Sequence, residues 1–208
     1  AEAPLFSAGL VRLDKQEHVL FFMPHHCIVD GWSFGVFLDE LGILYDAFRA
    51  GKSSPLPELP IQYADYAIWQ RDCLQGNELE RQLAFWREKL SGELPVLQLP
   101  TAYPRPSVRT TRGSAIRVLF PNTLVEPLRI LARAENATLF LVILTAFKVL
   151  LHRYSGQEDI CVGWPITTRT LPETETLIGM FLNALVLRTN VDPAISFREL
   201  LGRVRTGF

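Results

Sequence analysis

Apolar stretches separated by polar turns predict the elements of the first part of the chain. Residues 10–13 and 19–23 are apolar and flank the polar segment 14–17, which predicts two strands joined by a turn. The run 19–23 shows no polar alternation and therefore predicts a strand buried on both faces. Ser33 precedes apolar residues at helical spacing and Gly51 follows them, which predicts a helix with Ser33 as its N-cap and Gly51 as its stop.

The middle of the chain changes from helical spacing to proline-rich sequence. Residues 51–60 predict a loop from their Gly, Ser and Pro content. Residues 62–90 predict a helical region that is interrupted at Gly76-Asn77. Residues 92–106 contain four prolines and no helical period, which is typical of a linker.

The second half returns to alternating helices and strands. Thr123 and Glu126 have the spacing of a capping box, which predicts a helix start there. The remaining pattern predicts, in order, a strand over 114–120, a mostly buried helix over 138–154 ending at Gly156, strands over 159–164 and 185–191, and a helix beginning in 197–204. Strands that alternate with helices indicate layered α/β packing.

Composition excludes several classes of function. Hydrophobic residues make up 48% of the 208 positions, which is ample for a core. The net charge of −1, from 21 basic and 22 acidic residues without long runs, argues against a nucleic-acid groove or a polybasic membrane anchor. The three cysteines form no CxxC pair, the N-terminus shows no signal stretch, and the apolar run 139–151 is shorter than the ~20 residues of a membrane span. We expect a soluble cytoplasmic protein.

Two adjacent histidines at the end of an apolar strand are the strongest candidates for chemistry. Neighbouring side chains of a strand point to opposite faces, so only one of His25 and His26 can enter a given cleft, and the protein holds the other. Asp30 can anchor the following turn or brace an imidazole. Gly31 permits backbone conformations that are closed to other residues.

These residues also have other interpretations. An isolated HxxxD spacing more often marks structural histidines. Zinc is an alternative because His25 and Cys27 share a strand face, but no further pair at ligand spacing occurs, so no metal site is predicted. On a continuing strand Cys27 points away from His26, which favours a structural cysteine over a nucleophile.

Three segments together resemble a known family. They read HHCIVDGWS at 25–33, YADYAIWQR at 63–71 and IGMFLNALVLR at 178–188. They are similar to the HHxxxDG, YxDYAxW and GxFVNTxxLR motifs of the condensation domains of nonribosomal peptide synthetases, in the family's order and at family-like spacing. The resemblance extends over essentially all 208 residues.

The resemblance implies a two-lobed, chloramphenicol-acetyltransferase-like α/β fold that is incomplete here at both ends. Residues 1–91 would form the end of the first lobe with its crossing helices, 92–113 the linker between lobes, and 114–208 the first part of the second lobe. An arginine that pairs with Asp30 is expected in a family motif that would precede Ala1. We expect the isolated fragment to be inactive and to aggregate through exposed apolar faces and free strand edges.

The resemblance also implies a reaction, used in antibiotic and other secondary-metabolite biosynthesis. A carrier-bound acyl or peptidyl thioester is joined to the amine of a downstream carrier-bound aminoacyl thioester. His26 would stand at the reacting centre, His25 beside it as an orienting neighbour, Asp30 would hold the loop, and the Gly31 amide would donate near the reacting carbonyl. No cofactor would be bound directly, because donor and acceptor carrier domains deliver their phosphopantetheine arms; an adenylation domain of the same synthetase is the further expected partner. The motifs most resemble the type that joins an L donor to an L acceptor.

Asn183 and Trp32 are the candidate substrate-binding residues. Asn183 would orient substrate from a loop lining the cleft between lobes, although an amide there could equally brace the backbone. Residues 167–169 could border the substrate channel, whereas Arg188 and the aromatic residues of 63–69 are expected to be structural. Two other functions stay open: a non-catalytic remnant that docks carrier domains, and an HxxxD acyltransferase that uses acyl-CoA.

Overall fold

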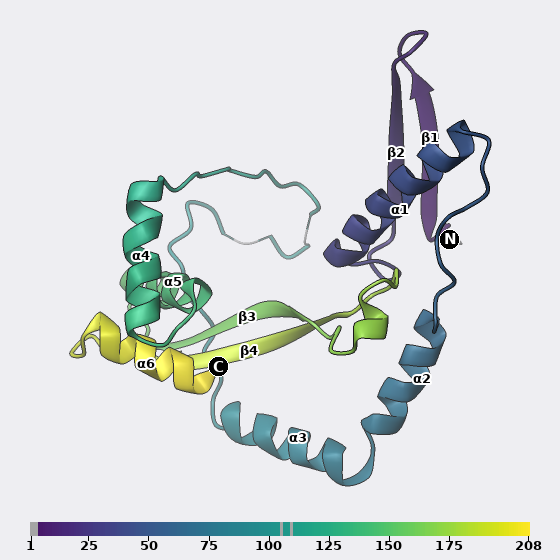
Figure 1. Ribbon diagram of the computed structural model, residues 1–208. Coiled ribbons are helices and arrows are strands. Elements are labelled where there is room, and N and C mark those ends of the chain that lie inside the picture. Colours follow the sequence, from purple (N-terminus) through teal and green to yellow (C-terminus); the bar gives the residue numbers. More distant parts are fainter. Residues whose placement is uncertain (1–3, 105, 109) are drawn as a thin grey trace. The chain divides into compact units, whose positions relative to one another are not determined.

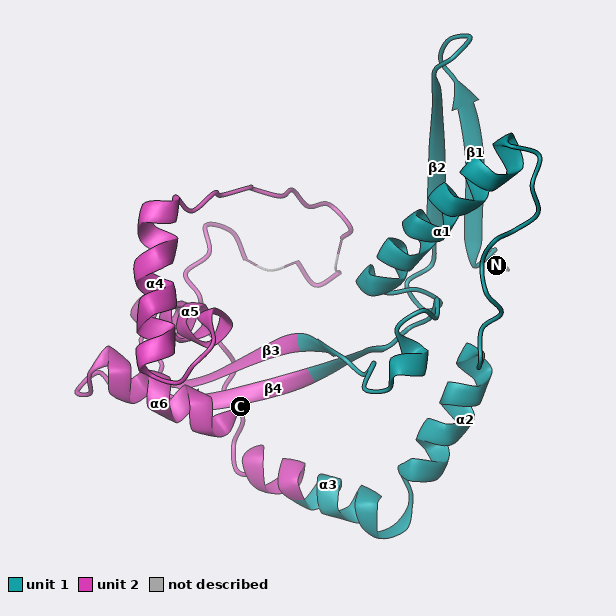
Figure 2. Ribbon diagram, in the orientation of Figure 1, with its two compact units in different colours: residues 1–84, 165–184 teal, residues 85–164, 185–208 magenta. Residues whose placement is uncertain are grey.

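The computed structural model describes residues 4–104, 106–108 and 110–208. The described residues combine helices with two strand pairs, which confirms the predicted mixed α/β class (Figure 1). The chain divides into two compact units, each built from two stretches of sequence. Unit 1 comprises residues 1–84 and 165–184, and unit 2 comprises residues 85–164 and 185–208 (Figure 2).

Unit 1 begins with a β-hairpin that is followed by helices. β1 (Phe6–Arg12) and β2 (His18–Pro24) pair antiparallel, from Phe6 opposite Pro24 to Arg12 opposite His18. Both predicted strands are therefore confirmed, and the first is longer than predicted. α1 (Gly31–Arg49) and α2 (Tyr63–Cys73) follow, joined by the predicted loop, and residues 165–184 add a short 3-10 helix, η1 (Pro172–Thr174).

The prediction that β2 is buried on both faces is wrong. Val19, Leu20 and Met23 are 47%, 48% and 61% exposed. β1 and β2 form a two-stranded sheet with no third strand among the described residues; Phe22 stacks on Phe37 of α1 with 4.4 Å between centroids, but the exposed side chains of β2 lack such cover. A hairpin of this kind is marginally stable by itself, and its free edges and faces remain available for packing.

α1 starts from a different cap than the one predicted. Asp30 is the N-cap and Ser33 is the third helical residue, and Oδ1 of Asp30 accepts a hydrogen bond from the Ser33 N–H at 2.8 Å. Aspartate and serine are both good N-caps, so composition alone did not separate them. The predicted stop is confirmed, because α1 ends at Arg49 and Gly51 has a φ of +70°, which favours glycine.

The core of unit 1 is small and aromatic. Tyr66, Leu177 and Phe181 are buried together, and Ile61 and Tyr63 pack against them. The rings of Tyr63 and Phe181 meet edge to face with 5.2 Å between centroids. The aromatic residues of α2 thus form a packing face, as predicted, and they hold the segment that contains Leu177 and Phe181.

Unit 2 contains three helices and parts of a second strand pair. The helices are α4 (Asn122–Ala134), α5 (Leu139–Ser155) and α6 (Phe197–Gly207). β3 (Asp159–Thr167) and β4 (Leu182–Asn190) are hydrogen-bonded neighbours that run from unit 2 into unit 1, and α3 (Gly76–Lys89) also crosses the division. The main core cluster of unit 2 consists of Ala132, Leu141, Val142, Leu144, Leu187, Leu201 and Val204.

α5 agrees with its prediction at both ends. The Thr138 side chain accepts a hydrogen bond from the Leu141 N–H at 3.3 Å, and Gly156 follows the helix with a φ of +69°. Only one face is buried, because Ile143 and Phe147 are 47% and 45% exposed. Among the described residues no helix alone is long and apolar enough to cross a membrane; α4 and α5 reach that length and composition only as a pair, bent by 104°.

Two predictions around the start of α4 are wrong. Residues 114–120 form no strand: Ile116 and Leu119 are 90% and 85% exposed, and no neighbouring strand among the described residues offers a hydrogen-bond ladder. The predicted capping box also fails. Pro121 is the N-cap of α4, and Glu126 pairs with Arg129 at 3.1 Å instead of reaching back to the helix start.

The proline-rich segment after α3 is held on unit 2 at its beginning. Arg188 donates to the carbonyl oxygens of Ser91 at 2.6 Å and Glu93 at 3.1 Å, and pairs with Asp159 at 2.7 Å. These contacts agree with a structural role for Arg188. The described residues of 92–113 form neither helix nor strand, and Arg105 and Arg109 lie outside them. The predicted lobe boundaries concern a larger fold and stay a prediction.

Unit 2 also buries a lysine. Nζ of Lys148 donates to the carbonyl oxygens of Ile160 at 3.2 Å and Leu187 at 2.6 Å, and to the Thr189 hydroxyl at 2.9 Å. The three acceptors match the three ammonium hydrogens. Burial lowers the pKa of Lys148 to about 8.

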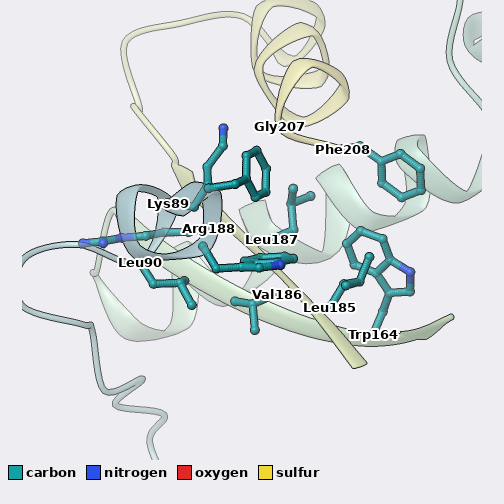
Figure 3. A pocket seen from close by; sticks show the side chains of 11 residues that line it. Lys89, Leu90, Trp164, Leu185, Val186, Leu187, Arg188, Gly207 and Phe208 are labelled. Carbon is teal, nitrogen blue, oxygen red and sulfur yellow. The ribbon is translucent and has the colours of Figure 1, made fainter. Parts of the chain in front are cut away.

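A small pocket of about 120 Å³ lies in unit 2, between the end of α3 and β4 (Figure 3). Its lining is mainly apolar and includes Trp86, Leu187 and the stacked rings of Trp164 and Phe208, whose centroids are 4.8 Å apart. None of the predicted site residues lines this pocket; they all lie in unit 1.

Candidate active site in unit 1

The two histidines lie in a turn, not on a strand. β2 ends at Pro24, and the Ile28 N–H donates to the His25 carbonyl at 3.1 Å, which closes a turn over residues 25–28. The strand alternation used to separate the two imidazoles therefore does not apply. The two imidazoles instead differ in their contacts, because Nδ1 of His25 accepts a hydrogen bond from the Cys27 N–H at 3.1 Å.

His26 is the unpaired member of the two exposed histidines. Its imidazole makes no hydrogen bond to any of the described residues, whereas the His25 imidazole braces its own turn. Cys27 is exposed beside them. The His26 ring is thus exposed and unpaired among the described residues, while the turn that carries it is braced by His25.

Asp30 fixes the far side of this turn. It is 2% exposed, and both of its carboxylate oxygens are used. Oδ1 accepts from the backbone N–H and hydroxyl of Ser33 at 2.8 and 2.7 Å, and Oδ2 accepts from the Phe181 N–H at 3.1 Å. Asp30 makes no hydrogen bond to an imidazole in the described part of the chain, so it anchors the loop and does not brace a histidine.

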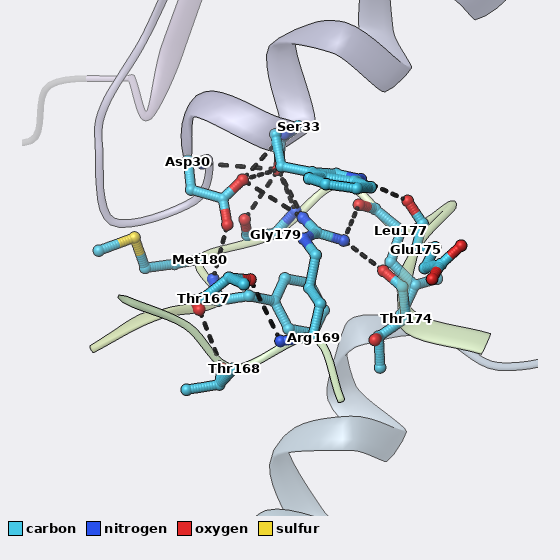
Figure 4. A network of polar contacts seen from close by, with 12 residues as sticks. Asp30, Ser33, Thr167, Thr168, Arg169, Thr174, Glu175, Leu177, Gly179 and Met180 are labelled. Atoms are coloured by element: carbon cyan, nitrogen blue, oxygen red, sulfur yellow. Dashed lines mark hydrogen bonds and ion pairs between the residues drawn. The ribbon is translucent and has the colours of Figure 1, made fainter. Parts of the chain in front are cut away.

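The Ser33 hydroxyl is the centre of this network (Figure 4). It lies 2.7 Å from Oδ1 of Asp30 and 2.9 Å from the Gly179 carbonyl, and it accepts from the Gly179 N–H at 3.1 Å. A hydroxyl has one hydrogen to donate, and a carboxylate is the stronger acceptor. Ser33 therefore donates chiefly to Asp30 and accepts from residue 179, which joins α1 to the segment 177–181.

The charge partner of Asp30 lies within this chain. Nη2 of Arg169 is 3.3 Å from Oδ1 of Asp30 and 3.0 Å from the Ser33 hydroxyl, and both charged side chains are 2% exposed. The expectation that this arginine would precede Ala1 is therefore wrong. Residues 167–169 were singled out only as a possible channel border, because sequence gives no sign of a pairing across 139 positions.

Arg169 also holds the loop around η1. Its Nη1 donates to the carbonyl oxygens of Thr174 and, at 2.9 Å, of Leu177. Its guanidinium carbon lies 3.9 Å from the centre of the Phe181 ring, a cation–π contact. Nε is buried without a hydrogen-bond partner among the described residues. One side chain thus joins the histidine loop, η1 and the aromatic core.

These contacts keep Asp30 ionised. Burial by itself acts to raise the pKa of its carboxyl, but the hydrogen bonds from Ser33 and Phe181 and the charge of Arg169 outweigh burial and lower it below the usual value. Burial raises the pKa of the nearby Tyr63. At neutral pH Asp30 therefore remains a carboxylate beside Arg169.

Gly31 and Trp32 are placed by the start of α1. Gly31 is the first residue of the helix; its φ is not positive, and a β-carbon there would meet no described atom within 4 Å apart from its chain neighbours and the adjacent backbone of its own helix. The backbone freedom that glycine permits is therefore not used at Gly31. Trp32 is 53% exposed, and its Nε1 donates to the Glu175 carbonyl at 2.8 Å.

Asn183 lies at the exposed start of β4. Asn183 is exposed, and its Oδ1 accepts from the Ala184 N–H at 2.8 Å, so the amide needs no further partner.

The residue next to Arg169 is held by α2. The Tyr66 hydroxyl donates to Thr168 Oγ1 at 2.9 Å. No group of three or more His, Cys, Asp or Glu side chains within the described ranges is placed to bind a metal ion.

Comparison with known proteins identifies the class. Residues 1–207 match the Condensation domain family, and the chain belongs to this family, the condensation domains of nonribosomal peptide synthetases. These domains are amide-bond-forming, acyltransferase-type proteins.

Curated relatives are peptide synthetases. The chain is 54% identical to one of the linear gramicidin synthase proteins of Brevibacillus parabrevis over 201 residues, 97% of the chain and 4% of that protein. It is 43% identical to phosphinothricin tripeptide synthetase PhsC of Streptomyces viridochromogenes over 99% of the chain and 19% of that protein. The chain is thus similar to a small part of each relative.

Solved structures share the fold. The X-domain from teicoplanin biosynthesis superposes with a TM-score of 0.90 at 27% identity, covering 99% of this chain and 47% of that one. The first condensation domain of the CDA synthetase gives a TM-score of 0.75 at 25% identity, covering 98% and 44%. The predicted fold class is confirmed, and the chain spans under half the length of these solved chains.

Proposed function

We propose that this chain carries the reacting-centre histidine of a condensation domain that joins two carrier-bound thioesters in the cytoplasm. The donor is an upstream acyl or peptidyl thioester, and the acceptor is the amine of a downstream aminoacyl thioester, of the L-donor and L-acceptor type. Donor and acceptor carrier domains would bring both substrates on phosphopantetheine arms, and an adenylation domain of the same synthetase would supply the acceptor. No resident cofactor takes part in this proposal.

The observation that supports it most is the contrast between His26 and Asp30. The buried contacts of Asp30 with Ser33, Arg169 and Phe181 fix the loop, and the His26 imidazole stays exposed and unpaired among the described residues. A general base needs this combination of a fixed backbone and a free ring nitrogen.

The reaction gives His26 a defined task. The amine attacks the thioester carbonyl, the C–N bond forms, the C–S bond breaks, and the upstream arm leaves as a thiol. An α-amino group has a pKa of about 7.7–8.0, so part of it is neutral near neutral pH without help. After attack the nitrogen becomes strongly acidic, and His26 accepts that proton, which the leaving sulfur takes up in the net reaction. The gain is typically about 10²–10⁴-fold in rate.

The other site residues have supporting roles in this proposal. His25 and Asp30 position the loop and exchange no proton. The Gly31 amide, at the start of α1, would donate to the oxygen of the tetrahedral intermediate. Trp32 and Asn183, both exposed, would contact the substrates.

A second candidate is a docking module without catalysis. The X-domain match has a TM-score of 0.90, and a related X-domain structure is a complex with OxyB. A domain of this fold can therefore serve as a binding partner. A third candidate is an acyltransferase whose acyl donor is an acyl-CoA instead of a carrier-bound thioester.

One assay separates these candidates. The chain is placed within a complete condensation domain, and a single turnover is measured with loaded donor and acceptor carrier domains, for wild type, His26→Ala and the control His18→Ala. We expect His26→Ala to lose about 10²–10⁴-fold and His18→Ala to react like wild type. Equal rates for both variants would remove His26 from the reaction. Absence of any turnover in folded wild type would favour the docking module, and equal use of a coenzyme A ester would favour the third candidate.

A further inference from the structure

Unit 1 contains a groove that the proposed reaction does not use. It has a volume of about 410 Å³ and lies among α1, the loop before α2, and residues 175–176. Its apolar lining includes Val36 and Ile43 of α1 and Leu56 and Leu59 of the loop. Ile43 is 47% exposed, so an apolar surface is open to a partner there.

Four acidic residues also line this groove. Asp39 and Glu40 stand on α1, Glu58 on the loop and Glu175 beside η1. No Lys, Arg or His lines the groove, and none of these four carboxylates forms an ion pair with a described residue. The chain as a whole has a net charge of only −1, so this is a local excess of negative charge. We call this surface the acidic groove.

We propose that the acidic groove binds a protein segment that carries apolar side chains flanked by lysine or arginine. The apolar lining would take the apolar side chains and exclude water, and the four carboxylates would pair with the cations. A neutral or acidic segment would leave the four carboxylates uncompensated, so charge decides between partners.

The occupant would also touch the loop that holds the site. Glu175 and Thr176 line the groove and lie between Thr174 and Leu177, whose carbonyl oxygens accept hydrogen bonds from Arg169. The Glu175 carbonyl also accepts from the Trp32 indole at 2.8 Å (Figure 4). Trp32 does not line the groove itself, so its N–H would report on occupation through the Glu175 carbonyl.

The test uses a complete condensation domain that contains this chain, and two dye-labelled synthetic peptides. One alternates leucine and lysine over six residues, and the other has glutamate in place of each lysine. Binding is followed by anisotropy at two salt concentrations, and the ¹⁵N–¹H indole signal of Trp32, assigned with Trp32→Phe, is recorded with and without the unlabelled lysine peptide.

We expect the lysine peptide to bind at least tenfold more tightly than the glutamate peptide and to weaken as salt rises. Glu40→Gln with Glu58→Gln should weaken binding about fivefold, since two exposed ion pairs are lost. The control Glu17→Gln with Glu88→Gln has the same net charge and should bind like wild type. The Trp32 indole signal should shift, and those of Trp86 and Trp164 should not.

Three outcomes would overturn the proposal. They are equal binding of both peptides, no binding because another segment of the domain fills the groove, and equal weakening of binding by the control variant. None of these readouts depends on condensation.

Discussion

Arg169 in unit 1 and Lys148 in unit 2 are both buried cations, but they are satisfied in different ways. Arg169 faces a carboxylate, a hydroxyl and two carbonyls that come from α1 and from the loop around η1. Lys148 faces only neutral acceptors, all on or beside the strands against which its helix packs. The arginine fork joins separate segments at the candidate site, whereas the ammonium fills three acceptors within one core.

The difference predicts which of the two cations can be substituted with the smaller loss of stability. Removing Arg169 leaves Asp30 buried with its charge unpaired, whereas removing Lys148 removes a buried charge and leaves neutral acceptors. Losing one partner of a buried ion pair is among the most destabilising changes known, and losing a donor to a neutral acceptor is milder.

The largest effect is expected for Arg169→Met. We expect it to lower the free energy of unfolding by about 3–5 kcal/mol, because the Asp30 carboxylate stays buried. Hydrogen exchange of unit 1 amides in a complete domain measures this loss. Arg71→Met, at an exposed position of α2, should change exchange little; equal effects of the two variants would contradict the assigned role of Arg169.

Lys148→Met should have a smaller effect, about 1–3 kcal/mol, seen in the exchange of unit 2 amides. The substitution should also change how the free energy of unfolding depends on pH. The folded pKa of Lys148, about 8, lies below the ordinary 10.5, so the unfolded chain binds more protons between these values and stability rises with pH across that window, by at most about 3 kcal/mol. The variant should lack this rise and Lys52→Met should retain it; a rise in both variants would assign it to another group.

Asp30 should also contribute a step to the acid unfolding of unit 1. The pKa of Asp30 is lowered in the folded state, so its contribution is complete above the ordinary aspartate pKa of about 3.9 and is lost as pH falls through the lower folded value. Acid unfolding of unit 1, followed by the fluorescence of its aromatic residues, should contain this step. Asp30→Asn should remove it and Asp46→Asn, at an exposed position, should not.

The smallest effect is expected for Tyr66→Phe. The lost hydroxyl donates to Thr168 and accepts from Gln70 at 2.9 Å each. We expect a loss of about 0.5–1.5 kcal/mol in thermal unfolding. Tyr45→Phe, where the ring is 65% exposed, is the matched control and should be neutral. A loss as large as that of Arg169→Met would mean that α2, not the ion pair, holds the site.

Local signals in the sequence predicted local structure well. Thr138 and Gly156 bound α5 as expected, because a cap acts within one turn of its helix. The N-cap of α1 was missed because Asp30 and Ser33 are both suitable caps; in the structure Asp30 takes the cap position, and its second carboxylate oxygen accepts from the distant Phe181 N–H.

Long-range structure was predicted less well. Residues 114–120 have strand-like spacing but no neighbouring strand among the described residues, and a strand is stabilised by its neighbours. The burial expected for β2 failed for the same reason. The motifs located His26 and Asp30, but the partner of Asp30 is 139 residues away, and no property of Arg169 in the sequence marks it.

If His26 reacts as proposed, the Asp30–Arg169 pair acts through it by holding its loop. Single-turnover condensation rates of a complete domain test this in four forms: wild type, Arg169→Lys, His26→Ala and the double variant. Lysine keeps the charge but cannot reach both carbonyls and Asp30, so the loop should shift and the rate should fall about tenfold. We expect Arg169→Lys to cause no further loss of rate once His26 is absent. An equal tenfold loss in both backgrounds would contradict it and would leave Arg169 a structural residue unconnected with His26.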